Sequence, residues 1–442
     1  MVSPTPLPAE AKRAPEISVR PTLRSLSISP TLRINEEVAA YRRAGREVYH
    51  MGFGEAPFPV HPAIRERIAT FSDKNSYLPS LGLPELREKA SAYLRRKLSL
   101  DATDHSVIVG PGSKELIFDV QLAVDGDLLF PAPSWVSYIP QTYITRDEVI
   151  RIHLDLQEHY KLSADRLDEA TLRAKERGHK PTKLILNYPN NPTGLSYTAA
   201  ELADLAEVAR SHELLVISDE IYALVSFAQE HVSIARYYPE GTIVTTGLSK
   251  HLSLGGFRLG IALLPATLDH ILGTIRSIAS ETFSSVSSPI QYAVLAAFEE
   301  SPEIEEYIRR CTEIHGAVTK YVWRKVRECG VDYPKPAGGF YLYPDFSHFR
   351  RDLADRGIST SEELATRLLS DVSVASLPGT AFGDLPENLR LRLSTVDYDG
   401  ARALEVYDSP ATWTEGRTDE FVETACPNVA EACRRLQRFF GV

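Results

Sequence analysis

The chain has 442 residues, more than a single hydrophobic core usually accommodates, so we expect two domains. Its 43% hydrophobic and 24% charged residues are typical of a globular protein, and no apolar run approaches the roughly 20 residues of a membrane helix. The net charge of −10 argues against a nucleic acid or an anionic membrane as partner.

The four cysteines, Cys311, Cys329, Cys426 and Cys433, show no CxxC spacing. Their positions support neither a disulfide framework nor a zinc site, and reduced cytosolic thiols are the simpler interpretation. We therefore expect a cytoplasmic protein without a bound metal.

The first part of the chain predicts an arm followed by helices. Residues 1–30 are proline-rich and lack the apolar block of a secretory signal, so we expect a loose N-terminal arm. Residues 31–46 predict a helix with Gly45 at its C-terminal end, and the segment from Val48 to Gly54 is expected to be extended. A second helix is predicted over residues 84–98.

Short apolar runs bounded by turn residues recur through the middle of the chain. Helical patterns, such as residues 198–211, lie between several of them. Strands that alternate with helices predict a mainly parallel sheet covered on both faces, and hence an α/β fold. The expected strands are 107–109, 127–130, 184–186, 214–217, 243–245 and 259–264.

The pattern changes in the last third. A helical region at 302–328 precedes apolar segments at 338–343 and 389–394, with a helix near 361–370 between them. These elements predict a second, smaller α+β domain. Residues 404–427 are polar and turn-rich, and we expect them to form an inserted loop.

The predicted domains follow from these patterns. Residues 65–330 are expected to form the large domain with the sheet. The small domain is expected to combine residues 31–64 with residues 331–442, so that two distant parts of the chain share one core.

The first candidate site motif is Ser249-Lys250, which follows an expected strand and precedes Arg258 by eight positions. Glycines on both sides of the lysine allow backbone and a bulky ligand to approach closely. An amine that forms an imine needs a partly desolvated site, and an arginine offers a planar fork to a phosphate. For this motif alone, an ordinary surface lysine is the alternative.

The second motif is Asp219-Glu220-Ile221-Tyr222, directly after the expected strand 214–217. Open α/β sheets bind ligands at the carboxyl ends of their strands. Asp219 can pair with a protonated pyridine nitrogen and Tyr222 can hydrogen-bond a ring oxygen. A helix N-cap is the alternative role for the aspartate.

Two further loops carry candidate residues. Asn191 lies in an Asn-Asn-Pro-Thr-Gly turn, where its amide can reach a ring oxygen and a carboxylate. Gly112, Ser113 and Lys114 lie between a strand and a helix, an arrangement that presents backbone N–H groups to a phosphate. Both loops also fit ordinary turns.

Taken together, these motifs resemble the fold type I enzymes that depend on pyridoxal phosphate (PLP), and among them the class I/II aminotransferases similar to aspartate aminotransferase. The likeness extends from about Thr31 to Thr395, and the order and spacing of the motifs carry it. It implies PLP held as a Schiff base on Lys250, transamination between an L-amino acid and a 2-oxo acid, and Lys250, Asp219 and Tyr222 as catalytic residues.

The resemblance assigns further roles. It implies that Trp135 stacks on the cofactor ring, and that Tyr77 reaches the phosphate of a neighbouring subunit in a homodimer with shared sites. Arg392 is implied to clamp the substrate α-carboxylate, although only the resemblance separates it from Arg390. The backbone of Gly54 is implied to contact the same carboxylate.

One departure from the family concerns the cofactor phosphate: the family often has a phosphate-binding serine where this chain has Gly247. Three other positions bear on the substrate. Phe283 occupies the position of an arginine that binds acidic side chains in well-known members. A second branch of aspartate aminotransferases uses a lysine and a threonine instead, and Lys114 and Thr31 match them.

Other chemistries fit the same motifs. Similar folds host elimination or replacement, cyclisation and oxidation of larger amino acids with the same cofactor. A binding domain with a degraded site is a further alternative, which the complete set of motif residues disfavours.

Overall fold

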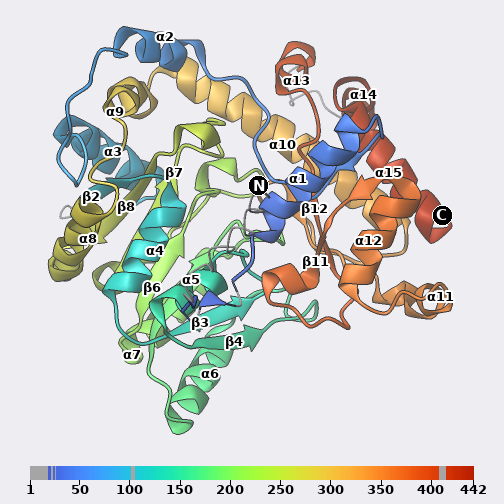
Figure 1. Ribbon diagram of the computed structural model, residues 1–442, viewed down its shortest axis with the longest axis horizontal. Coiled ribbons are helices and arrows are strands. Elements are labelled where there is room, and N and C mark those ends of the chain that lie inside the picture. Colours follow the sequence, from blue (N-terminus) through green and yellow to red (C-terminus); the bar gives the residue numbers. More distant parts are fainter. Residues whose placement is uncertain (1–17, 21–22, 25, 101–104, 408–414) are drawn as a thin grey trace, which may run out of the picture.

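A seven-stranded sheet forms the centre of the left-hand half of Figure 1. The computed structural model describes residues 18–442 except 21–22, 25, 101–104 and 408–414. The strands are β2 (His105–Gly110), β3 (Asp127–Ala132), β4 (Val149–His153), β5 (Pro181–Asn187), β6 (Leu215–Asp219), β7 (Thr242–Gly247) and β8 (Gly260–Pro265). Their order is β2-β8-β7-β6-β5-β3-β4, and β8 runs in the opposite direction to the other six strands. The predicted, mainly parallel α/β fold is confirmed.

Helices cover both faces of this sheet. Alternate residues of β3 point to opposite faces: Leu128 and Phe130 share a core with α4 and α8, whereas Leu129 shares one with α6 and α7. The helices of this half are α2 (Pro62–Thr70), α3 (Pro84–Lys97), α4 (Ser113–Ala123), α5 (Tyr138–Thr145), α6 (Ala164–Glu176), α7 (Ala199–Ser211), α8 (Asp269–Glu281) and α9 (Ser288–Ala293).

The right-hand half of Figure 1 combines the beginning of the described chain with its last third. Strand β1 (Tyr49–His50) pairs in parallel with β10 (Val374–Ala375), and β11 (Leu377–Pro378), β12 (Leu391–Ser394) and β9 (Tyr341–Leu342) form a small antiparallel sheet. The helices are α1 (Pro30–Arg43), α10 (Pro302–Glu328), α11 (Arg350–Asp355), α12 (Ser361–Val372), α13 (Gly400–Val406), α14 (Glu415–Ala425) and α15 (Pro427–Phe440).

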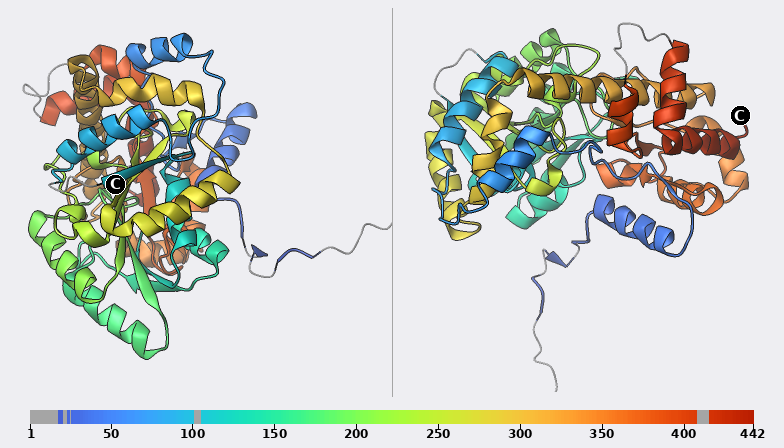
Figure 2. Two further views of the ribbon diagram at one scale, coloured as in Figure 1. Left: turned by 90° about the vertical axis from the view of Figure 1, so that its left-hand side faces the viewer. Right: turned by 90° about the horizontal axis from the view of Figure 1, so that it is seen from above.

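The long helix α10 connects the two halves. Ile304 and Ile308 near its start pack in the core below α2 and α3, whereas Ile314, Val318 and Val322 pack in the core of the other half. Figure 2 shows, in its right-hand view, α10 running from one half of the protein into the other. Most of the predicted arm, residues 1–30, lies outside the described residues.

The expected loop over residues 404–427 is wrong. Helix α13 ends at Val406, and α14 occupies most of the remainder, while residues 408–414 lie outside the described ranges. Helix α14 buries Phe421, Val422 and Ala425. Because most residues of α14 are polar, the sequence did not indicate a helix. Its few apolar residues nevertheless form a narrow stripe that packs against α10.

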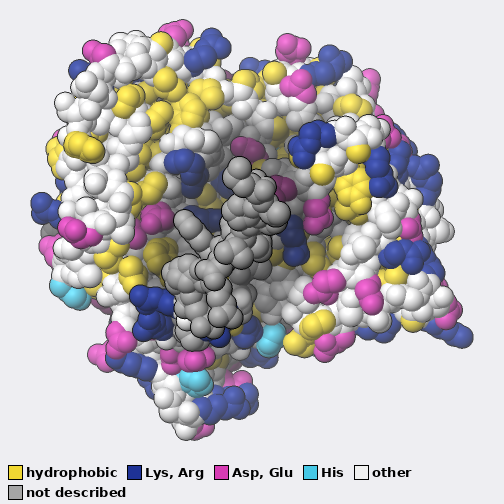
Figure 3. Space-filling model, in the orientation of Figure 1, with side chains coloured by type: hydrophobic (Ala, Val, Ile, Leu, Met, Phe, Trp, Pro, Cys, Tyr) yellow, Lys and Arg dark blue, Asp and Glu magenta, His cyan; other side chains and the backbone are white. Residues whose placement is uncertain are grey.

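The surface carries charges of both signs. On the face shown in Figure 3, acidic and basic side chains are interspersed, so neither sign dominates that face. Within the described ranges, no helix is both long and apolar enough to cross a membrane.

Asp119 on α4 is an unusual buried group. The residue is fully buried, and neither carboxylate oxygen has a hydrogen-bond partner among the described residues. Burial, with a smaller contribution from the charge of Glu115, raises the pKa of Asp119 from 3.8 to about 7. The charged form is therefore disfavoured in the folded protein.

We expect Asp119→Asn to stabilise the protein at pH 8. Since the folded pKa lies above the unfolded value, the folded state binds more protons between pH 4 and pH 7, and wild-type stability falls across that range. The neutral amide avoids this loss, so the variant should gain about 1–3 kcal/mol at pH 8 and little near pH 4. Thermal unfolding at both pH values measures the difference. An equal midpoint at pH 8 contradicts the expectation.

Candidate active site

A cavity of about 380 Å³ opens at the carboxyl ends of the parallel strands, where Asn187 ends β5 and Asp219 ends β6. It lies between the sheet and the segments contributed by the other half. Thirteen of the predicted site residues line it: Thr31, Gly54, Gly112, Ser113, Lys114, Trp135, Asn191, Asp219, Tyr222, Ser249, Lys250, Arg258 and Arg392.

Asp219 is held at the end of β6 by neighbouring polar groups. Tyr138 Oη donates to Asp219 Oδ2 (2.5 Å), and Asn187 Nδ2 donates to its backbone carbonyl (2.9 Å). Burial raises the pKa of Asp219 to about 6, although the hydrogen bond from Tyr138 and the charge of Lys250 oppose this shift. A cation placed beside this carboxylate would restore its charge.

Lys250 points into the cavity after the end of β7. Its Nζ donates to the backbone carbonyl of Gly54 (2.8 Å) and lies 5.6 Å from the centroids of the Tyr222 and Phe340 rings. Tyr222 Oη in turn lies 2.9 Å from Tyr341 Oη. The amine has no carboxylate partner among the described residues, so it is available to a ligand.

Arg392 and Arg390 differ sharply in their surroundings. Arg390 forms ion pairs with Asp345 (2.9 Å) and Asp384 (3.1 Å). Arg392 is 1% exposed, and its protein partners are the Asn191 amide oxygen (3.3 Å) and the carbonyl of Gly52.

The guanidinium of Arg392 can therefore still donate hydrogen bonds to a ligand. Its Nε has no hydrogen-bond partner among the described residues, and burial lowers its pKa. A buried guanidinium without a carboxylate favours an anionic ligand. The structure thus separates two arginines that the sequence alone left equivalent.

The predicted phosphate-binding region consists of the loop that leads into α4 and the side chain of Arg258. Gly112 (φ +96°) is the N-cap of α4, so the start of this helix, whose first N–H groups have no partner within the helix, lies just beyond the end of β2, and Gly112 and Ser113 line the cavity. Arg258 Nη2 donates to Pro111 O (3.2 Å) and Nη1 to Gly255 O (2.8 Å). No carboxylate in the described chain neutralises this guanidinium, which leaves it free to meet an anion.

Gly247 replaces the serine that often occurs at this position, and its surroundings explain the difference. A Cβ at Gly247 would lie 2.9 Å from the carbonyl oxygen of Leu259 on the adjacent chain segment. Any larger residue would force the two segments apart. The missing hydroxyl is therefore tied to the close packing of β7 against β8.

Lys114, in the first turn of α4, also lines the cavity. Its Nζ is 5.1 Å from the centroid of the Trp135 ring. Removal from water lowers the pKa of Lys114, and the charges of Arg258 and Lys250 lower it further. Thr31, in the first turn of α1, also lines the cavity, and its Oγ1 lies 2.9 Å from Ser29 Oγ.

Phe283 and Tyr77 do not line this cavity. Phe283 follows the end of α8 and is half-buried, and Tyr77 is 90% exposed. Within a single chain neither residue reaches the site, so their predicted roles stay predictions.

Several residues of the site escaped the sequence analysis. Tyr341 lines the cavity and contacts Tyr222, and Asn187 lines it and supports Asp219 from the neighbouring strand. Tyr138 lies behind the cavity wall, fully buried, and donates to Asp219. The strand-end argument that identified Asp219 applies equally to Asn187 and would have found it. The others in the cavity are Leu32, Phe53, Glu55, Ile221 and Gly255.

The residues fit PLP, the cofactor that the resemblance implies. Asp219 offers a buried carboxylate to a ring nitrogen, and Lys250 offers an amine. Arg258 and the start of α4 offer donors to a phosphate, while Trp135 offers an aromatic face.

We expect Arg392→Met and Arg390→Met to have opposite effects on stability. Removing Arg392, a buried cation without a carboxylate partner among the described residues, should raise the unfolding midpoint of the substrate-free protein. The same substitution should reduce kcat/KM for an amino acid roughly 100-fold. Removing Arg390 should cost about 3–5 kcal/mol, because it leaves Asp345 and Asp384 without their cation. Thermal unfolding and steady-state kinetics measure both effects. A strongly destabilised Arg392→Met with normal kcat/KM would contradict this assignment.

Comparison with known proteins agrees with this geometry. Residues 46–404 match the family described as aminotransferase class I and II. The chain is 34% identical over 382 residues to the aspartate aminotransferase of Geobacillus stearothermophilus, covering 84% of this chain and 93% of the relative. It is 31% identical over 381 residues to that of Bacillus subtilis, again covering 84% and 93%.

The fold also matches a solved structure. Aspartate aminotransferase from Thermus thermophilus, solved with maleate, is 25% identical and superimposes with a TM-score of 0.80, covering 96% of this chain and 99% of that one. Family, fold and motif order therefore agree. The chain belongs to the class I and II aminotransferases and is a PLP-dependent transferase.

Proposed function

We propose that this aminotransferase acts on a dicarboxylic L-amino acid, such as aspartate or glutamate, and a 2-oxo acid. The observation that carries the proposal is the presence of Lys114 and Arg392 in one cavity, each without a carboxylate partner among the described residues. Two separate cations suit a substrate with two carboxylates, one at each end.

The relatives support this substrate class. Those of Geobacillus stearothermophilus and Bacillus subtilis are named aspartate aminotransferases, and the Thermus thermophilus structure contains maleate, a dicarboxylate. The match of Lys114 and Thr31 to the second branch of such enzymes points the same way.

The proposed roles follow from the geometry. Bound PLP supplies an electron sink for the reaction at the substrate Cα. Asp219, oriented by Tyr138, provides the negative charge that holds a proton on the ring nitrogen. Lys250 Nζ takes up the α-proton as a general base. Arg392 and Asn191 orient the α-carboxylate so that the Cα–H bond faces the amine.

The remaining cavity residues would hold the cofactor. Arg258, Ser249 and the Gly112–Lys114 loop offer donors to its phosphate, Tyr222 offers a hydroxyl to its ring oxygen, and Trp135 covers its ring.

Assembly and organisation complete the proposal. The 90% exposure of Tyr77 supports a homodimer in which this tyrosine serves the partner's site. Sedimentation analysis can test the dimeric state.

The four cysteines are free and buried, in keeping with a reducing cytoplasm. The separate cores support a domain boundary near residue 64, since Phe58 belongs to one core and Ile64 to the other, whereas the second change of core falls within α10, between Ile308 and Cys311, and not at residue 330.

We expect borohydride reduction to label Lys250. The purified holoenzyme should lose its visible absorption on reduction, and peptide mapping should find the cofactor on the peptide with Lys250, because this amine lies in the cavity after the end of β7 and has the motif context of the aldimine lysine. Lys250→Ala should lack both the absorption and the label. A label on a different lysine would contradict the assignment.

We expect Lys114→Ala to reduce activity selectively on acidic substrates. Loss of a charged hydrogen bond costs about 1.5–3 kcal/mol, so kcat/KM for aspartate should fall roughly tenfold to a hundredfold. A neutral amino acid should be affected much less. Steady-state kinetics with both substrates measures the ratio. Equal losses would mean that Lys114 serves the cofactor or the fold, and would argue against the dicarboxylic substrate.

A further inference from the structure

Helices α4 and α5 are joined by a pair of glutamine side chains. Gln121 Nε2 on α4 donates to Gln141 Oε1 on α5 (3.1 Å), and Gln141 Nε2 donates to the backbone carbonyl of Lys114 (2.9 Å). Gln121 and Gln141 are 1% and 7% exposed. The bridge therefore lies away from water, where each amide atom needs its protein partner.

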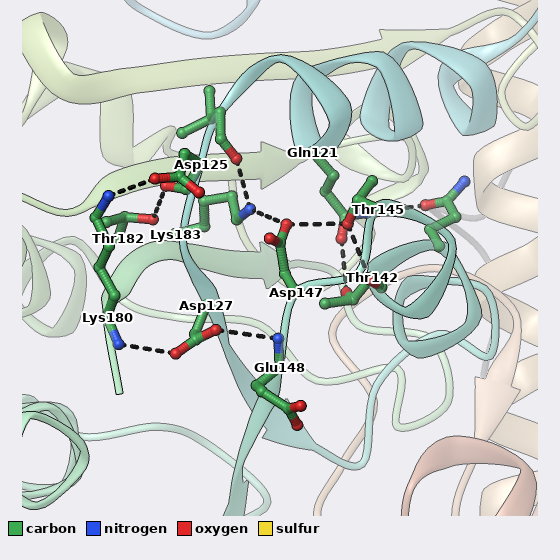
Figure 4. A network of polar contacts seen from close by, with 12 residues as sticks. Gln121, Asp125, Asp127, Thr142, Thr145, Asp147, Glu148, Lys180, Thr182 and Lys183 are labelled. Atoms are coloured by element: carbon green, nitrogen blue, oxygen red, sulfur yellow. Dashed lines mark hydrogen bonds and ion pairs between the residues drawn. The ribbon is translucent and has the colours of Figure 1, made fainter. Parts of the chain in front are cut away.

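The orientation of both amides is fixed by the backbone carbonyl of Lys114, which can only accept a hydrogen bond. Gln141 therefore turns its nitrogen to Lys114 and its oxygen to Gln121, so the nitrogen of Gln121 faces Gln141. The oxygen of Gln121 is then left to accept from Thr142 Oγ1 (2.7 Å), a contact that Figure 4 shows. Turning Gln141 over would place its oxygen against the carbonyl of Lys114 and break the bridge.

A buried ion pair anchors the far end of α5 to the sheet. Lys183 on β5 is fully buried, and its Nζ pairs with Asp147 Oδ2 (2.7 Å) and donates to the carbonyl of Val124 (2.7 Å). Thr145 Oγ1 donates to the same Asp147 oxygen (2.9 Å), as Figure 4 shows. Helix α5 is thus a fixed support from which Gln141 reaches α4.

The backbone that Gln141 holds belongs to the lysine that enters the active-site cavity. Lys114 Nζ lies against the Trp135 ring, in the segment that leads into α5. Gln141 itself does not line that cavity. Its contact with the substrate is therefore indirect, through the position of the first turn of α4.

We propose that Gln141 is a positioning residue that sets where the Lys114 ammonium lies and thereby contributes to the choice of substrate side chain. The inference rests on the proposed role of Lys114 toward a dicarboxylic substrate. A displaced first turn would move the ammonium while leaving Lys250, Asp219 and Arg392 on their own strands and loops. It would also shift the phosphate donors at the start of α4, which serve every substrate, so the effect that passes through Lys114 is measured as the ratio of activity on acidic and neutral substrates.

A double-mutant cycle tests this role. Gln141→Met keeps the length and shape of the side chain but cannot donate to Lys114. We expect it to lower kcat/KM for aspartate roughly tenfold, mainly through a higher KM, with a smaller change for a neutral amino acid. In the Lys114→Ala background, the same substitution should cause no further change in the ratio of the two substrates.

Thr145→Val is the matched control, because it removes a hydrogen bond from the same network but leaves the Lys183–Asp147 ion pair, which anchors α5, and both glutamine contacts in place. It should leave the substrate ratio unchanged. An equal effect of Thr145→Val, or a full additional loss of selectivity in the Lys114→Ala background, would show that Gln141 supports only the fold and would overturn the inference.

Two further outcomes separate the inference from the proposal beneath it. If Lys114→Ala loses activity selectively on acidic substrates but Gln141→Met does not, the positioning role of Gln141 is overturned and the dicarboxylic substrate stands. If neither variant changes the ratio of activity on acidic and neutral substrates, both the positioning role and the proposed substrate class are overturned. If Gln141→Met does not fold, Gln141→Asn carries the same comparison, since it keeps the amide but is too short to span both partners.

Discussion

The active site depends on charges that are buried before any ligand supplies their counterparts. Asp219 and Arg392 are both nearly inaccessible to water, and neither forms an ion pair in the described part of the chain. Burial accordingly shifts each pKa toward the neutral form, upward for the acid and downward for the base. A cofactor nitrogen and a substrate carboxylate would relieve these penalties, so the site stores free energy that is released on binding.

The apolar cores of the protein offset the free-energy cost of these buried charges. Alternate sides of the sheet are filled by separate apolar cores, and a third core joins the beginning of the described chain to its last third. Arg390 and Arg392 show how differently the fold treats two buried cations that lie close together in the chain. Arg390 is neutralised by Asp345 and Asp384 and stabilises the small sheet, whereas Arg392, two residues later, is kept without such a partner.

Sequence patterns predicted the elements whose signal is local. The apolar runs at β5, β6 and β7 gave the sheet, and motifs at strand ends gave Asp219, Asn191 and Lys250. The failures have physical causes. Helix α14 was taken for a loop because its apolar stripe is narrow. Tyr341 was missed because its role arises only when the two halves of the chain meet.

Side-chain selectivity is the property least visible in the motifs. Lys114 belongs to a recognisable loop, yet the direction of its ammonium depends on how α4 packs against α5. That packing combines an apolar contact with the bridge of Gln121 and Gln141, residues 20 positions apart that belong to no motif. Because the bridge lies behind the cavity wall, the role proposed for Gln141 implies that two enzymes with identical cavity residues could present the same lysine differently. On that proposal, substrate preference in this enzyme depends on helix packing as well as on the residues that touch the ligand.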